Sequence, residues 1–310
     1  IKPMRKFIAL FIFAAAFLFF LNHRFIYEYK FVADSTQKDH STSEMMFLDI
    51  TKNGSKYYSR EVYVQDSITK ADIEKQMKTG NFNVNIKRSD KGKVRYKVTK
   101  DYTKNKTFFN TRIGTDSYKI LEDRTLDWKI LPEKQKIGSW EAQKATAEFA
   151  GRKWTAWFAE ELPFNDGPYK FKGLPGLIVK ISDETNSHSM ELRGTSKFVQ
   201  TEEESAAQNT TTGNGTVTKT VILGDGFGNA KEEIEISREK FKKLFWEDRE
   251  DPAKSLKMMQ GREGVVMKFK DQNGNDMSMA DMIKRQEEVR KEANKKNNNL
   301  LEIDLLNKSK

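Results

Sequence analysis

Residues 167–178 read Gly-Pro-Tyr-Lys-Phe-Lys-Gly-Leu-Pro-Gly-Leu-Ile, a stretch that places a tight apolar bend in the middle of the chain. Proline presets φ at about −65°, so Pro175 suits the second position of a turn. Gly176 suits the third position of a type II turn, which needs a positive φ. Leu174 and Leu177 flank this bend, and an apolar turn gains nothing from exposure to water. We therefore predict that the bend is buried or covered by aromatic side chains, and that the chain leaves it as a β-strand.

Aromatic residues are concentrated around this bend. Four of the five tryptophans fall within 30 residues, at positions 128, 140, 154 and 157. Trp154 and Trp157 differ in parity, so a regular strand places them on opposite faces; we expect Trp154 in the core and Trp157 to be the more exposed. The cluster either fills the core beneath the bend or lines a binding groove. In the second case the candidate binding residues are Trp154, Trp157, Tyr169 and Phe171, while the structural motif is Gly173, Leu174, Pro175, Gly176, Leu177 and Ile178.

Short β-strands account for most of the chain on either side of the bend. In residues 24–32, Arg-Phe-Ile-Tyr-Glu-Tyr-Lys-Phe-Val, every second side chain is aromatic, which indicates a strand with one buried face. A turn at 52–55 predicts a hairpin. Further alternating runs are separated by Asp, Asn, Gly or Lys clusters, and they lie at 45–50, 82–86, 94–99, 107–112, 118–122, 126–131, 141–149, 153–158, 177–181, 188–198, 217–223 and 265–270.

Helices are expected early and late in the chain. A short one is predicted at 70–78. Ser237 suits the N-cap of a second, and Ser278 with Asp281 resembles a capping box that starts a third. This element order predicts an α+β fold, mainly antiparallel β, with a curved or half-barrel-like meander sheet and helices packed on one face. Residues 200–216 are expected to be a flexible polar loop, and 291–310 a charged C-terminal tail after one domain spanning 23–290.

The first residues predict export. Lys2, Arg5 and Lys6 precede an uncharged apolar run of 15 residues, from Phe7 to Leu21. This length is typical of the h-region of a signal peptide and is short for a membrane span, which needs about 20 residues. We expect residues 1–22 to form a signal peptide. An uncleaved membrane anchor is the alternative, because no A-x-A cleavage pattern follows the run.

Composition excludes several classes of site. The chain has no cysteine, which excludes disulfides, thiol nucleophiles, cysteine metal ligands and a lipid anchor on an N-terminal cysteine. The net charge is +10, and removal of the three positive charges in residues 1–21 leaves +7. Basic residues are scattered among the 45 acidic ones, which indicates a mixed solvated surface. Export disfavours nucleic acid as a partner.

The bend carries a resemblance to a known family. The run 167–178, with Gly151, Arg152 and Trp154 before it and Asp183 after it, is similar to the defining motif of the GLPGLI family. The opening strand at 27–30 and the block at 48–56 also resemble that family. The resemblance implies an exported protein of Bacteroidetes, located in the periplasm or at the outer membrane of a Gram-negative cell. It implies no activity, cofactor or catalytic residue.

Catalytic patterns are scarce in the sequence. His23, His40 and His188 are the three histidines, and their spacing matches no metal-binding motif, so we expect structural roles for them and no metal. Glu160 and Glu161, with Asp166 nearby, are candidates for the acid and base of a hydrolase. Adjacent residues on an extended strand point to opposite faces, however, so a solvated loop edge is the competing interpretation.

These observations favour a non-enzymatic cell-envelope binding protein for a hydrophobic or extended partner, with no cofactor. The partner is expected to be an outer-membrane protein, a lipoprotein or a lipid. An envelope hydrolase that uses carboxylates is the alternative, and a structural component held to anionic lipid by its charge is a third possibility. The sequence leaves the oligomeric state open.

Overall fold

The computed structural model describes residues 22–79, 92–114, 116–198, 233–260, 269–270 and 276–308. The leader, the strands predicted at 82–86 and 217–223, the polar loop at 200–216 and a turn at 272–275 lie outside the described residues. The chain divides into two compact units, which are described separately. The first comprises residues 1–28, 44–107 and 192–230, and the second residues 29–43, 108–191 and 231–310.

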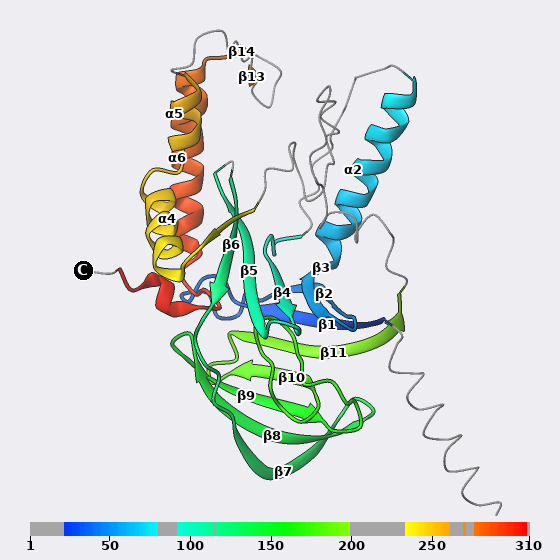
Figure 1. Ribbon diagram of the computed structural model, residues 1–310. Coiled ribbons are helices and arrows are strands. Elements are labelled where there is room, and N and C mark those ends of the chain that lie inside the picture. Colours follow the sequence, from blue (N-terminus) through cyan, green and yellow to red (C-terminus); the bar gives the residue numbers. More distant parts are fainter. Residues whose placement is uncertain are drawn as a thin grey trace, which may run out of the picture. The chain divides into compact units, whose positions relative to one another are not determined.

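Strands are the most frequent regular elements of the described structure (Figure 1). Twelve of them follow one another in the hydrogen-bonded order β12-β6-β5-β4-β3-β2-β1-β11-β10-β9-β8-β7, which is an open sheet. Neighbours in the chain are mostly neighbours in the sheet, as expected for a meander. The fold class is therefore confirmed as mainly antiparallel, with β12 beside β6 as a parallel exception. The twelve strands are β1 (His23–Phe31), β2 (Thr42–Ile50), β3 (Gly54–Ser59), β4 (Lys97–Asp101), β5 (Lys106–Ile113), β6 (Asp116–Glu122), β7 (Lys129–Ile137), β8 (Trp140–Phe149), β9 (Arg152–Ala159), β10 (Leu177–Asp183), β11 (His188–Lys197) and β12 (Ile234–Ile236).

In the first unit, the predicted aromatic face of β1 is confirmed, since Phe25 and Tyr27 are at most 1% exposed. The helix α2 (Arg60–Thr79) begins ten residues earlier than the predicted 70–78. Ser59 explains the early start, because its hydroxyl accepts a hydrogen bond from the backbone N–H of Val62 and so satisfies one free donor of the first turn. The same hydroxyl donates to the buried carboxylate of Glu44. The start of α2 is thus set by a contact with β2.

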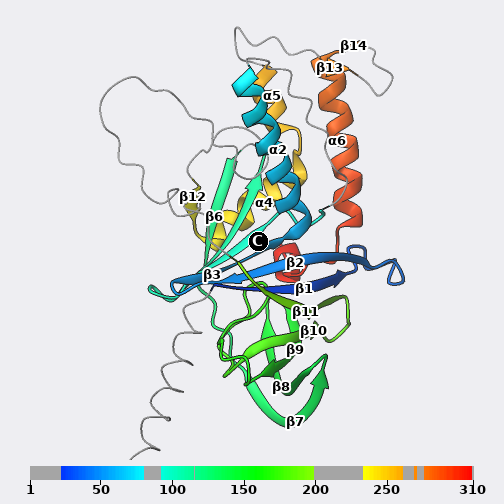
Figure 2. The same ribbon diagram turned by 90° about the vertical axis from the view of Figure 1, so that its right-hand side faces the viewer.

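In the second unit, β7 to β10 lie side by side in sequence order (Figure 2). The β8–β9 hairpin turns through Ala150 and Gly151, whose φ angles are +57° and +80°. Two successive positive φ angles are the requirement of a two-residue turn that matches the twist of the strands. The predicted hairpin around residues 150–152 is therefore confirmed.

A helical layer completes the second unit. The helix α4 (Arg238–Glu250) packs against β6, and α6 (Met279–Lys296) packs against α4 (Figure 1). Both predicted N-caps are confirmed: Ser237 accepts from Lys240 N at 3.3 Å, and Ser278 from Asp281 N at 3.1 Å. The remaining elements are α5 (Lys254–Gln260), a pair of two-residue strands, β13 (Phe269–Lys270) and β14 (Asp276–Met277), and a 3-10 turn, η1 (Ile303–Leu306). A small core joins Tyr118, Ile120, Ile236, Phe241 and Leu305.

The C-terminal segment is packed into this unit, although the sequence predicted a charged tail from residue 291. The helix α6 continues to Lys296, and the following residues Asn299, Leu301 and Glu302 are buried. The Asn299 side chain donates to the carbonyl oxygen of Val32 at 2.8 Å. Residues 291–299 are charged and amide-rich, but residues 300–306 read Leu-Leu-Glu-Ile-Asp-Leu-Leu, and their apolar side chains together with the hydrogen bonds of Asn299 order the segment.

The leucines of the bend at 173–178 are buried, whereas Gly173 and Pro175 are exposed, and the predicted geometry of the bend is wrong. Leu174 and Leu177 are at most 1% exposed, as expected. The positive φ, +98°, belongs to Gly173, whereas φ of Gly176 is not positive. The N–H of Gly176 donates to the carbonyl of Leu174 at 2.8 Å, which makes a three-residue bend centred on Pro175. Gly176 is needed for a different reason, because a β-carbon there would lie 2.3 Å from the carbonyl oxygen of Ala159.

Candidate functional site

The two faces of the β8–β9–β10 region differ sharply. On one face Trp154 is 1% exposed, its indole N–H donates to the carbonyl of Phe149 at 3.0 Å, and its ring centroid lies 4.8 Å from that of Phe171. Tyr169 and Phe171 are also at most 2% exposed. Three of the four candidate binding residues are therefore buried, and we call these three the aromatic layer.

Trp157 lies on the opposite face, half-buried, as its parity predicted. It is directly opposite Lys144 of β8 on one side and Lys180 of β10 on the other. Lys144 forms an ion pair with Glu133 of β7 at 3.5 Å, and Lys180 forms one with Glu191 of β11 at 2.9 Å. The result is a row across five strands, Glu133–Lys144–Trp157–Lys180–Glu191, which we call the Trp157 row.

The surroundings of the Trp157 row differ at its two sides. On one side lies a second row of small hydroxyl side chains, in which Thr155 is opposite Thr146 and Ser182, and Ser182 is opposite Ser189. On the other side the next residues on this face are Ala142, Ala159 and Leu177, all completely buried. Beyond Trp157, this face is therefore covered on the side of Ala142 and polar on the side of Thr155.

Trp157 has no side-chain hydrogen bond or ring contact in the parts of the chain that the structure describes. By contrast, the indole N–H groups of Trp128, Trp154 and Trp246 each donate to a backbone carbonyl, at 2.9 to 3.0 Å. An indole usually finds a partner for its N–H when it packs inside a protein. The indole N–H of Trp157 has no partner among the described residues, which makes Trp157 the candidate contact residue of this unit.

A buried ion cluster adjoins the aromatic layer at Tyr169. Glu302 is 4% exposed and accepts from Lys170, from Tyr169 Oη at 2.6 Å, from Arg238 at 2.6 Å and from Arg124 at 3.0 Å. Burial raises the pKa of the Glu302 carboxyl, but the three cations more than offset this and hold the pKa well below its usual range. Every oxygen of this carboxylate is occupied by the protein itself, which indicates a structural role.

A second buried network surrounds His188. Its Nε2 lies 3.0 Å from the carbonyl oxygen of Asn299, which can only accept, so Nε2 carries the proton. Nδ1 then accepts from the hydroxyl of Tyr29 at 2.7 Å. Burial, together with the charge of Arg152, lowers the pKa of His188 to about 4. The neutral imidazole, with both nitrogens bonded and only 2% exposed, has no access to a substrate.

The other candidate chemical groups do not converge on an open site. Glu160 and Glu161 are exposed, whereas Asp166 is 2% exposed and accepts from the backbone N–H of Gly167 at 2.6 Å. His40 is exposed and His23 is half-buried. Within the described ranges, no three side chains of metal-ligating type come together. None of the described helices is both long and apolar enough to cross a bilayer.

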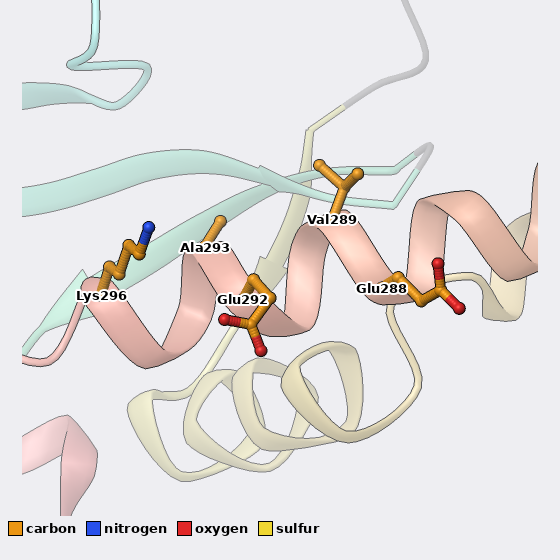
Figure 3. Close-up of a pocket in the computed structure, with 5 residues that line it drawn as sticks. All are labelled: Glu288, Val289, Glu292, Ala293 and Lys296. Atoms are coloured by element: carbon orange, nitrogen blue, oxygen red, sulfur yellow. The ribbon is translucent and has the colours of Figure 1, made fainter.

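An open hollow of about 490 Å³ lies along α6, lined by Glu288, Val289, Glu292, Ala293 and Lys296 (Figure 3). Val289 and Ala293 point to the same side of the helix, and the two carboxylates point away from them (Figure 3). Val289 is 61% exposed. The lining comes from one helix, and its charges are mixed.

Residues 148–180 match the model of a family described as "Protein of unknown function (Porph_ging)". The match covers β9, the aromatic layer and the bend. No curated protein matches the chain. Two solved structures are similar, "Structure of PNGF-II in P21 space group" and "Structure of PNGF-II in C2 space group", with 13% and 12% identity and a TM-score of 0.46 for each. Both alignments cover 74% of this chain but only 34% and 33% of the PNGF-II chains, so this chain spans about a third of their length.

Proposed function

We propose that this chain is a non-enzymatic binding protein of the bacterial cell envelope, exported and of the GLPGLI type, and that the Trp157 row is its binding surface. The partner is hydrophobic or extended, such as an outer-membrane protein, a lipoprotein or a lipid. The observation that carries the proposal is the side chain of Trp157, which is half-buried and makes no hydrogen bond or ring contact among the described residues.

The side chain of Trp157 has the properties of a binding residue. A tryptophan side chain offers more apolar area than most residues, and its N–H gives direction to a contact. At this position it contributes less to the stability of the fold than Trp154 does, because Trp154 is fully buried and Trp157 is half-buried. Charged neighbours fixed by ion pairs hold the ring in a defined setting, as a preorganised contact surface requires.

The test is a comparison of captured partners rather than capture alone. The full chain, immobilised, is exposed to a detergent-solubilised envelope extract of the organism that produces it, and bound proteins and lipids are identified by mass spectrometry. We expect one identified partner that wild type retains and Trp157→Ala loses. Tyr102→Ala, which removes an exposed aromatic residue from the β4–β5 turn, is the matched control and should retain it. A partner set that is the same for all three proteins would refute the proposal.

The export of the protein is tested by a separate measurement. N-terminal sequencing of the mature protein, after fractionation of the cells, tells whether residues 1–22 have been removed. Recovery of the full chain from the cytoplasm would contradict the export part of the proposal.

A further inference from the structure

The chemistry around Trp157 narrows the class of its ligand. The strand that carries it, β9, is hydrogen-bonded along both edges, to β8 and to β10. It therefore has no free backbone groups with which to add an extended peptide as a further strand. Any ligand that reaches Trp157 must bind through side chains alone.

Charge argues against an anionic ligand. The Trp157 row holds two lysines and two glutamates, and each lysine is already paired with one glutamate. The row is formally neutral, so it offers little net attraction to a phosphate headgroup or an acidic polymer.

The neighbouring positions argue against an acyl chain. The apolar residues nearest to Trp157 on its own face, Ala142, Ala159 and Leu177, are completely buried and offer no surface. The open side carries hydroxyl groups instead, from Thr146, Thr155 and Ser182. One flat apolar ring bordered by hydroxyl, ammonium and carboxylate groups is complementary to a molecule with a flat apolar face and a rim of hydroxyls.

We infer that the Trp157 row binds a neutral glycan chain, with one sugar ring stacked on the indole of Trp157. The C–H face of the sugar covers the ring, while its hydroxyls bond to the ends of Lys144 and Lys180 and to the hydroxyl row. Five strands at about 4.8 Å spacing make the row about 19 Å long, enough for several sugar units laid across the strands. This inference rests on the proposed function and specifies the extended partner.

A second indole extends the same face. Trp140 is four residues before Lys144 on β8, and its even number places it on the face of Trp157. It is half-buried and, like Trp157, makes no side-chain hydrogen bond or ring contact among the described residues. It lies against Gly138, where a β-carbon would be 3.3 Å from its ring. Trp140 is about 13 Å along β8 from the Trp157 row, on the side that Ala142 closes, and therefore lies outside the row.

The experiment measures binding of purified chain to neutral hexasaccharides of glucose, N-acetylglucosamine and mannose by saturation-transfer NMR and calorimetry. We expect at least one of them to bind at concentrations of about 1 mM or below, and Trp157→Ala to weaken it about tenfold or more. Trp157→Phe, which keeps a stacking ring, should lose less affinity for the hexasaccharide. Tyr102→Ala should leave this affinity unchanged. Trp140→Ala, which removes an indole outside the row, should leave hexasaccharide binding unchanged.

Two controls separate this inference from the proposed function. Vesicles of phosphatidylcholine with phosphatidylglycerol are tested with the same variants. Trp157-dependent binding of vesicles, or a Trp157-dependent protein partner from the envelope extract, with no hexasaccharide bound, would overturn the glycan inference and leave the proposed function standing. Hexasaccharide binding that Trp157→Ala leaves unchanged would also overturn it. If Trp157→Ala weakens the binding of no glycan, no vesicle and no envelope protein, both the glycan inference and the proposed function are wrong.

Discussion

Gly176 approaches Ala159 so closely that a β-carbon at position 176 would lie 2.3 Å from the carbonyl oxygen of Ala159. The same carbon would lie 2.9 Å from the α-carbon of Glu160. Both neighbours are backbone, which cannot move aside as the end of a flexible side chain can. The glycine of the bend is therefore required by packing between two segments of the chain.

The first prediction follows from this contact. Gly176→Ala should lower the free energy of unfolding by about 3 kcal/mol or more, because strand backbone must shift to admit the methyl group. Gly194→Ala is the matched control: no atom lies within 4 Å of its added β-carbon, and its φ is not positive, so the change should be within about 0.5 kcal/mol. Urea unfolding of both variants measures the difference. Equal stabilities would show that the close approach is not needed.

The second prediction concerns the two tryptophans of β9. Trp154→Ala should cost about 3–5 kcal/mol, because it opens a cavity beside Phe171 in the aromatic layer. Trp157→Ala should cost less than about 1.5 kcal/mol, because the ring is half-exposed and makes no side-chain hydrogen bond. Denaturant unfolding of each purified variant gives the two values. A larger loss of stability for Trp157→Ala than for Trp154→Ala would contradict the placement of Trp154 in the core.

The third prediction is a pH dependence set by His188. Its pKa is lowered from 6.5 to about 4 in the folded protein, so between these values the unfolded chain binds more protons than the folded one. Stability is then full above pH of about 6.5 and falls as the pH drops toward 4, by up to about 3 kcal/mol from this group. The carboxyl of Glu302, whose pKa is also lowered, adds a loss at lower pH because its stabilising charge disappears there.

The variant His188→Gln isolates the histidine. Glutamine has no titratable group, so the dependence of the unfolding free energy on pH between pH 6.5 and pH 4 should be flatter in this variant than in the wild type. His40→Gln, at an exposed loop position, should leave the slope unchanged. Thermal unfolding across the pH range provides the measurement, and identical slopes for all three proteins would contradict the assignment of the neutral form.

The fourth prediction addresses the C-terminal segment. Glu302→Gln removes one charge from a buried cluster and leaves Lys170, Arg124 and Arg238 with an uncompensated surplus, so it should cost about 3–5 kcal/mol. Glu292→Gln on the outer face of α6 breaks only an exposed pair with Lys295, and should change stability by less than about 0.5 kcal/mol.

A truncation extends this prediction. A chain that ends after Lys296 loses Glu302 and also Asn299, the hydrogen-bond partner of His188. It should unfold at lower urea concentration than the Glu302→Gln variant, because it removes both networks together. A truncated protein as stable as the wild type would show that residues 297–310 behave as the tail that their composition suggests.

Much of the architecture was readable from local patterns. The aromatic alternation of β1, the β8–β9 hairpin, the N-caps Ser237 and Ser278 and the opposite facing of Trp154 and Trp157 are all confirmed. Each depends on neighbours within a few residues: alternation every two residues in a strand, a hydroxyl three residues from an N–H, a pair of residues at a turn. Export, partner and family type stay predictions.

Only the tertiary structure decided the rest, because the groups involved are far apart in the chain. Arg124 meets Glu302 across 178 positions, and no periodicity links them. The carboxylates of the C-terminal segment are expected to be solvated unless cations compensate them, and these cations come from distant residues, Arg124, Lys170 and Arg238. Likewise the sequence of the bend determined that it is tight and apolar, but the role of Gly176 depends on where Ala159 lies.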